Sequence, residues 1–209
     1  MTRIKVCGIT EPEDARAAAR LGVNAVGLNF YDGSPRAINP ECALRIIEVL
    51  PPFVSTVGVF VNYDDPGVLE DFALSLGLDA VQLHGDETPD FCSMIKRVKV
   101  IKVIRVAQDF KLDLLRKYSP AAYLLDTHSS EGYGGTGFTF DWNKVAGATG
   151  FGQIILAGGL RTENVGKAIE VLRPFAVDVS SGVEREPGKK DFGLMKSFVE
   201  AVQKADTVA

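Results

Sequence analysis

Four side chains that can transfer protons stand at the ends of short apolar runs in this chain. Cys7 closes the run RIKVC, His84 follows DAVQL, Asp126 closes AYLLD, and Asp178 lies within AVDVS. Buried carboxyl groups that gather at one site are typical of acid–base catalysis. If the fold brings these four run ends to one place, the sequence predicts an active site there.

Cys7 can be read as a core residue, a metal ligand, half of a disulfide or a reacting group. The chain has three cysteines and two histidines, without paired-ligand spacing, so neither a disulfide framework nor a metal site is expected. Cys42 and Cys92 share helical faces with apolar residues and are expected to be core thiols. Cys7 instead shares a strand face with Lys5, and a nearby cation favours the thiolate. We therefore expect Cys7 to be reactive.

Two glycine- and serine-rich segments, LAGGL and VDVSSGVE, point to an anion site. Glycine lets the backbone approach an anion closely, while serine adds hydroxyl donors to the backbone amides. The segments follow two consecutive apolar runs, which favours a phosphate site over ordinary turns. The residues expected to bind phosphate are Gly158, Gly159, Ser180, Ser181 and Gly182.

Two further features have weaker signals. Arg36, in GSPRA, either faces solvent or grips a carboxylate with its guanidinium fork, and the residues alone leave both readings open. The segment Gly132–Gly137, GYGGTG, matches a dinucleotide-binding pattern. It lacks the following helix and the acidic residue that the pattern requires, so a loop over the substrate is the better interpretation. His128 is expected in the same loop, facing solvent.

The elements that must position these residues alternate along the whole chain. Short apolar runs are separated by amphipathic segments, giving eight strand–helix units at a mean spacing of roughly 26 residues. Thr10 and Glu13 have the spacing of a capping box, and Gly22 is placed to end the first helix. Eight such units predict a (β/α)8 TIM barrel of minimal length, a single domain over residues 1–209. A doubly wound open sheet is the alternative.

A barrel makes a specific demand on the strands, because active residues should lie at their carboxyl ends on the inward face. Successive strand residues point to opposite faces. In four of the runs the apolar residues fall on one face, and the polar residue at the end falls on the other. The inward pairs predicted in this way are Lys5 with Cys7, Gln82 with His84, Leu124 with Asp126, and Asp178 with Ser180.

Composition limits the class of protein. The chain has 209 residues, of which 46% are hydrophobic, and a formal net charge of −4. This charge argues against a nucleic-acid-binding protein, which would carry a concentrated basic surface. No apolar run reaches the length of a membrane span, and the chain starts with a strand rather than a leader. We expect a cytoplasmic protein without a membrane or nucleic-acid partner.

Several motifs in order give the chain a resemblance to the phosphoribosylanthranilate isomerase family. They are KVCGIT, SPR, QLHG, LLD, GGTG with FDW, LAGGL, and DVSSGVE followed by PGKKD, about one for each expected barrel loop. The resemblance implies an isomerase of tryptophan biosynthesis. Its substrate would be the phosphosugar N-(5'-phosphoribosyl)anthranilate and its product 1-(2-carboxyphenylamino)-1-deoxyribulose 5-phosphate. The reaction would be an Amadori rearrangement with no cofactor, no metal and no obligate protein partner.

The resemblance also implies roles. Asp126 would be the general acid that protonates the furanose ring oxygen, and Cys7 the general base that removes the C2' proton. Arg36 would hold the anthranilate carboxylate, and His84 and Asp178 would line the pocket. The rivals are another phosphosugar enzyme, such as indole-glycerol-phosphate synthase or ribulose-phosphate epimerase, and a barrel that binds phosphate without catalysis. The inward thiol and carboxyl group argue against the last.

Overall fold

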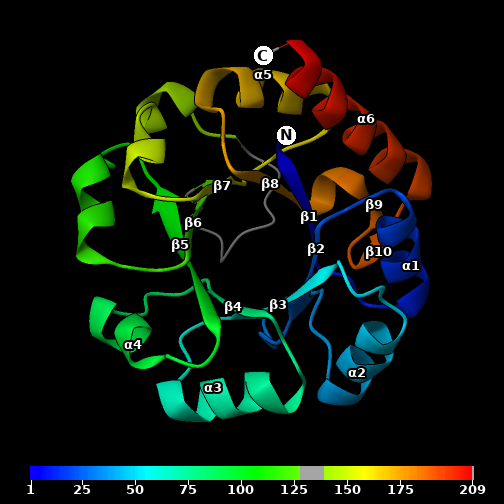
Figure 1. Cartoon of the computed structure of the whole chain (residues 1–209), viewed down its shortest axis with the longest axis vertical. Helices are drawn as coiled ribbons and strands as arrows, with labels where there is room; N and C mark the ends of the chain where they lie inside the picture. Colours follow the sequence, from blue (N-terminus) through cyan, green and yellow to red (C-terminus); the bar gives the residue numbers. More distant parts are fainter. Residues whose placement is uncertain (128–138, 209) are drawn as a thin grey trace.

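The computed structural model describes residues 1–127 and 139–208, and within them eight parallel strands form a closed barrel inside a ring of helices (Figure 1). β1 pairs with both β2 and β8, which closes the sheet. The predicted (β/α)8 barrel is confirmed, and the open sheet is excluded. The strands are β1 (Arg3–Cys7), β2 (Ala25–Asn29), β3 (Ser55–Phe60), β4 (Ala80–Leu83), β5 (Lys99–Val106), β6 (Ala122–Thr127), β7 (Ile154–Leu156) and β8 (Ala176–Val179).

The segments between the strands are mostly helical. The α-helices are α1 (Pro12–Arg20), α2 (Pro40–Glu48), α3 (Pro66–Ser75), α4 (Pro89–Met94), α5 (Thr162–Leu172) and α6 (Phe192–Val208). Short 3₁₀ segments stand where helices were expected after β5 and β6, and 3₁₀ structure is commonly found in such short pieces. These segments are η1 (Leu112–Lys117), η2 (Trp142–Val145), η3 (Ala148–Phe151) and, after β8, η4 (Ser181–Val183).

The starts of the helices show local sequence rules at work. Proline occupies the first turn of α1, α2, α3 and α4, where its missing N–H costs nothing. Asn39 caps α2 by accepting from the Cys42 amide at 2.9 Å. The predicted capping box of α1 is wrong. Glu11 is the N-cap residue of α1, with no side-chain cap, and the Thr10 hydroxyl instead donates to the Gly188 carbonyl. Gly22 does adopt the left-handed conformation, with φ +81°.

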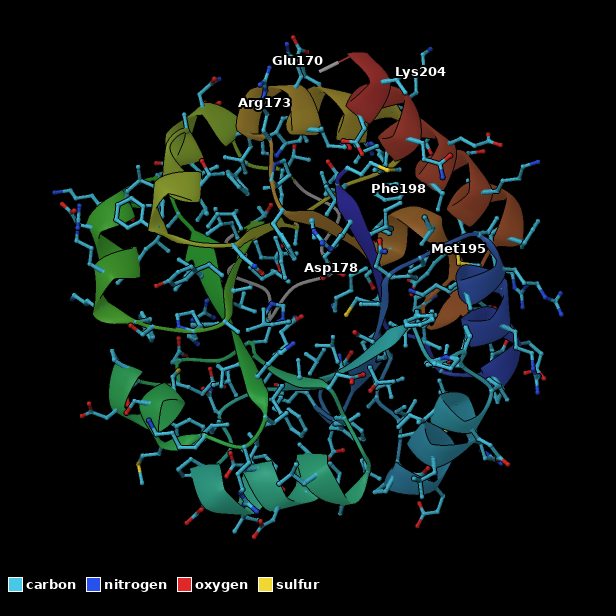
Figure 2. All side chains as sticks on the ribbon, viewed as in Figure 1. Glu170, Arg173, Asp178, Met195, Phe198 and Lys204 are labelled. Carbon is cyan, nitrogen blue, oxygen red and sulfur yellow. The ribbon has the colours of Figure 1, made fainter. Side chains whose placement is uncertain are left out.

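The strands bury two separate apolar layers. A small cluster of mainly β-branched residues and alanines fills the inside of the barrel: Val57, Ala80, Ile101, Val103, Ala122, Leu124, Ile155, Ala157 and Ala176. A larger cluster packs between strands and helices and includes Val6, Leu83, Leu125 and Val179. Figure 2 shows the same division, with Asp178 near the barrel axis and Met195 and Phe198 of α6 in the outer ring. The predicted alternation of inward and outward residues is therefore confirmed.

A hairpin after β8 was not predicted. Its strands β9 (Glu184–Glu186) and β10 (Lys189–Lys190) are antiparallel, and Figure 1 places them beside α1. The Lys190 amide donates to Asp14 Oδ2 of α1 at 2.8 Å, which fixes the hairpin against the barrel. Among the described residues, none of the helices has the length and apolar character needed to cross a membrane.

Candidate active site

A cavity of about 310 Å³ opens at the carboxyl ends of the barrel strands, and its volume suits a small molecule. Its wall draws on the ends of β1, β2, β3, β4, β6, β7 and β8. The predicted site residues that line it are Cys7, Arg36, His84, Asp126, Gly158, Gly159, Asp178, Ser180 and Ser181. Gly182 lies behind the wall, where an added Cβ would collide with the Leu160 carbonyl. The fold thus brings together residues from the whole length of the chain.

Lys5 and Asp178 form an ion pair on one side of this cavity. Lys5 Nζ lies 3.0 Å from each Asp178 carboxylate oxygen, and both side chains are buried. Burial lowers the pKa of Lys5, but the charges of Asp178 and Cys7 outweigh burial, so that pKa lies above its ordinary value. The ammonium group therefore stays charged beside the Cys7 thiol.

Cys7 is held in a crowded setting at the end of β1. It pairs in register with Gly27 of β2, and a Cβ at Gly27 would lie 2.6 Å from Cys7 Sγ and 3.1 Å from Lys5 Nζ. Burial raises the pKa of the Cys7 thiol, and Asp178 adds to that rise, while Lys5 and Lys190 oppose it. The net direction is upward. Lys5 does lower the pKa of Cys7, as expected. In the free protein, however, burial raises that pKa by more than Lys5 lowers it.

Asp126 lies in a hydrogen-bonded chain with Gln82 of β4 and with His84, the residue that follows β4. Asp126 Oδ1 accepts from the Thr127 amide at 2.7 Å, and Oδ2 lies 3.2 Å from His84 Nε2. His84 Nδ1 in turn lies 3.1 Å from Gln82 Nε2. If the Gln82 amide donates to Nδ1, the imidazole proton sits on Nε2 and faces the carboxylate. The histidine thus holds Asp126 in one orientation at the cavity wall.

The predicted phosphate loops include two glycines whose backbone conformation other residues rarely adopt. Gly158 and Gly159 adopt the left-handed conformation, with φ of +86° and +61°. A Cβ at Gly158 would lie 2.9 Å from Asp126 Oδ1 and closer still to Thr127, so only glycine fits there. Ser180 and Ser181 complete the same side of the cavity.

Arg36 reaches the cavity from the loop after β2 but does not face solvent freely. Its Nε and Nη2 donate to the two oxygens of Glu184 at 2.9 Å and 2.7 Å, and its side chain is 12% exposed. Glu184 therefore fixes the plane of the guanidinium group. Nη1 is the nitrogen that Glu184 does not engage, and it can donate to a ligand in the cavity.

Sequence reasoning did not assign roles to Gln82, Glu184 and Lys190. Gln82 falls on the inward face by alternation, so the same rule that found His84 could have selected it. Glu184 and Lys190 lie on either side of Pro187 and Gly188, a dipeptide that marks a turn. That signal predicts a hairpin without showing that it bends back over the active site.

The remaining candidates lie elsewhere. Cys92 is buried in α4, where burial raises its pKa to about 11, and the Cys42 thiol donates to the Thr10 carbonyl at 3.2 Å. Both are structural, as predicted. His128 and the Gly132–Gly137 segment lie outside the described residues. In the part of the chain that is described, no three His, Cys, Asp or Glu side chains gather as metal ligands would.

Comparison with known proteins identifies the family. The family described as N-(5'-phosphoribosyl)anthranilate (PRA) isomerase matches residues 4–201. The N-(5'-phosphoribosyl)anthranilate isomerases of Geobacter sulfurreducens and Geobacter metallireducens are 51% and 49% identical over 199 residues each, which is 95% of this chain and 97% and 98% of theirs.

Solved structures agree with the sequence comparison. The phosphoribosyl anthranilate isomerase of Thermotoga maritima superposes with a TM-score of 0.89 at 45% identity, covering 98% of this chain and 100% of that one. Another phosphoribosyl anthranilate isomerase structure, in complex with reduced 1-(o-carboxyphenylamino)-1-deoxyribulose 5-phosphate, has a TM-score of 0.86 at 44% identity, with the same coverage. The chain therefore belongs to the N-(5'-phosphoribosyl)anthranilate isomerase family.

Proposed function

We propose that this protein converts N-(5'-phosphoribosyl)anthranilate to 1-(2-carboxyphenylamino)-1-deoxyribulose 5-phosphate in tryptophan biosynthesis, in the cytoplasm. One observation carries the proposal: a thiol from β1 and a carboxyl group from β6 line the same cavity as two anion-binding loops and an arginine. A phosphosugar that bears an aromatic carboxylate needs each of these groups. Membership of the family and the related structure with a reduced phosphosugar ligand support the same reaction.

Ring opening is the first step of the proposed mechanism. Asp126, in its protonated form, gives its proton to the furanose ring oxygen. The C1'–O bond breaks as the nitrogen lone pair forms a C1'=N iminium ion. The Asp126 carboxylate that results is stabilised by the Thr127 amide and by His84 Nε2, which already lie within hydrogen-bonding distance.

Proton removal from C2' is the second step. The Cys7 thiolate takes the proton, and the electron pair of the C2'–H bond moves to form C1'=C2' as the iminium nitrogen becomes neutral. The enolamine then gains a proton at C1' and loses one from the C2' hydroxyl group, which gives the ketone. Lys5 stabilises the thiolate between these proton transfers, because its positive charge lowers the pKa of the Cys7 thiol.

Binding of the two ends of the substrate places the sugar between acid and base. The phosphate docks on the loops of Gly158, Gly159, Ser180, Ser181 and Gly182, and Arg36 binds the anthranilate carboxylate. His84 borders the sugar beside Asp126, and Asp178 acts by holding Lys5. The direct test is to add freshly made N-(5'-phosphoribosyl)anthranilate and follow the loss of its fluorescence. A protein that leaves the fluorescence unchanged would contradict the proposal.

Loss of the Arg36 side chain should weaken binding more than chemistry. Arg36→Ala removes a charge-assisted contact worth roughly 1.5–3 kcal/mol, so we expect KM to rise about 10-fold to 100-fold while kcat changes little. Steady-state kinetics over a range of substrate concentrations measures both. Arg16→Ala, which removes an exposed arginine of α1, is the control. An unchanged KM would remove Arg36 from the substrate site.

A single methyl group at Gly27 should disturb the proposed base without touching the acid. Gly27→Ala puts a Cβ 2.6 Å from Cys7 Sγ and 3.0 Å from Cys7 Cα, and the Gly27 backbone itself is not left-handed, so the strain falls mainly on Cys7. A displacement of about 1 Å at a reacting group can cost 10²-fold in rate, so we expect kcat to fall at least about 10-fold. The matched control is Gly166→Ala in α5, where the added Cβ meets nothing closer than 4.0 Å.

A further inference from the structure

Lys190 is a buried lysine beside the candidate active site that the mechanism above does not use. It lies on β10, and its side chain is 0% exposed. Its Nζ donates to the Cys7 carbonyl oxygen at 2.6 Å, to the Ser180 carbonyl oxygen at 3.3 Å, and to Glu184 Oε1 at 2.6 Å. An ammonium group has three N–H donors, so these acceptors use all of them. Lys190 therefore joins the ends of β1 and β8 to the hairpin.

Glu184 extends this cluster to Arg36. The carboxylate accepts from Lys190 at one oxygen and from the guanidinium group of Arg36 at both. Burial raises the pKa of Glu184, but the bonds from Arg36 and Lys190 outweigh burial and keep that pKa below its ordinary value. Glu184 is thus an anion held between two cations.

The charges of this trio decide what Arg36 can bind. Burial lowers the pKa of Lys190, and its bond to Glu184 opposes that fall. With the ammonium form of Lys190, held by three acceptors, Arg36 and Lys190 each carry +1 and Glu184 carries −1, which leaves the cluster at +1. Without Lys190, Glu184 would neutralise Arg36 fully, and the buried pair would have no excess charge to attract an anion. Charge effects are strong here, because all three side chains are largely shielded from water.

We propose that Lys190 is a positioning residue for substrate recognition, which balances the charge of Glu184 so that Arg36 can bind a carboxylate. Lys190 also ties this arginine to the strand ends that carry Cys7 and Ser180. The inference rests on the proposed function, in which Arg36 receives the anthranilate carboxylate. It adds a residue that touches no substrate but sets the preference for a carboxylated one.

Two ligands that differ only in the carboxylate can test this role. One is the reduced product analogue, 1-(o-carboxyphenylamino)-1-deoxyribitol 5-phosphate, and the other is the same compound made from aniline. We expect the wild type to bind the carboxylated analogue at least about 10-fold more tightly, as a charge-assisted contact predicts. Lys190→Met should bring this preference to within about threefold while affinity for the aniline analogue is retained. Calorimetric titration gives both dissociation constants.

A second substitution separates charge balance from simple support of the fold. In Lys190→Met/Glu184→Gln the uncompensated carboxylate is gone, so Arg36 regains its excess charge, and the preference for the carboxylated analogue should return. If Lys190 served only to hold the hairpin, the double variant would bind no better than the single one. If Lys190→Met does not fold, Glu184→Gln alone decides, because charge balance requires its preference to equal or exceed that of the wild type.

Lys102→Met is the matched control for removing a buried lysine. Lys102 also has three acceptors, the Leu83 and Gly85 carbonyl oxygens and Glu87 Oε2, and Glu184 is not among them. The Lys102→Met substitution should lower the melting temperature and leave the preference for the carboxylated analogue unchanged. A wild-type preference that persists in Lys190→Met would overturn this inference alone. A wild type without any preference would instead overturn the role of Arg36 in the proposed function, and this inference with it.

Discussion

Asp126→Asn is expected to lower kcat by at least about 10²-fold, because the amide N–H is far too weak an acid to protonate the furanose ring oxygen. The change keeps the size and shape of the side chain. Its oxygen can still accept from the Thr127 amide, as Asp126 Oδ1 does at 2.7 Å. Binding of the phosphate end should therefore be nearly unchanged, and the inhibition constant for inorganic phosphate, measured alongside kcat, reports on it.

The hydrogen-bonded chain behind Asp126 explains why this variant should fold. An amide nitrogen in place of Oδ2 would face His84 Nε2, so the imidazole would have to carry its proton on Nδ1. After its amide turns over, Gln82 can accept a hydrogen bond from Nδ1–H through Oε1, which has no partner among the described residues. The network can thus reverse its hydrogen-bond polarity by rotation of one side-chain amide.

Asp79→Asn is the control for this experiment. Asp79 also accepts from a backbone amide, that of Thr56 at 2.7 Å, but it lies before β4 at the opposite end of the barrel. We expect kcat to stay within about twofold for this variant, as is usual away from a site. An Asp126→Asn enzyme with wild-type turnover would show that the proton comes from another group.

The fold could be predicted because its rules are local and repeated. In each strand the alternation of apolar and polar residues shows which side chains point inward. The sequence alone therefore places Cys7, His84 and Asp178 at the carboxyl-terminal end of the barrel. Gly158 and Gly159 could be placed there for a similar reason, since both follow a strand. The short 3₁₀ segments were not predicted, because over six residues such as Leu112–Lys117 the spacing of apolar positions does not distinguish a 3₁₀-helix from an α-helix.

The residues that hold the site in place could not be predicted, because they act through contacts between segments that are far apart in the sequence. Arg36 meets Glu184 across 148 positions of sequence, and Lys190 meets the Cys7 carbonyl across 183. No periodic pattern encodes either meeting. The net proton affinity of Cys7 was unpredictable for a related reason. The cation beside it is visible in the sequence, whereas the extent of burial that outweighs this cation depends on the completed barrel.

Cys7→Ala should be as damaging as the loss of the acid, with kcat reduced at least about 10²-fold, because alanine cannot take the C2' proton. Cys92→Ala is the matched control, since it removes a buried thiol that faces the helix layer. The control should lose stability and keep kcat, whereas Cys7→Ala should lose kcat and keep its affinity for inorganic phosphate. A Cys7→Ala enzyme with near-normal turnover would exclude the thiol as the base.

The raised pKa of Cys7 adds a dependence on pH that only the wild type should show. The thiolate fraction grows as pH rises toward that pKa, so the rate of C2' proton removal, measured in single turnovers, should increase with pH across the neutral and mildly alkaline range, whereas the need for a protonated Asp126 in ring opening acts in the opposite direction on kcat/KM. The groups that face the thiol are Lys5, Asp178 and Lys190; the pKa of Lys5 lies above its ordinary value, whereas burial lowers the pKa of Lys190 and its bond to Glu184 opposes that fall. Residual activity of Cys7→Ala should lack this rise.

Stability should respond to pH in the opposite direction. Burial favours the neutral thiol, so the folded protein keeps the Cys7 proton at a pH where the unfolded chain, with a thiol pKa of about 8.5, has released it. The contribution of Cys7 to folding is therefore complete below about pH 8.5 and declines as pH rises toward the folded pKa. Above that pH the melting temperature of the wild type should fall more steeply than that of Cys7→Ala. Parallel curves would mean that the thiol has the same proton affinity in both states, and that burial does not govern the proposed base.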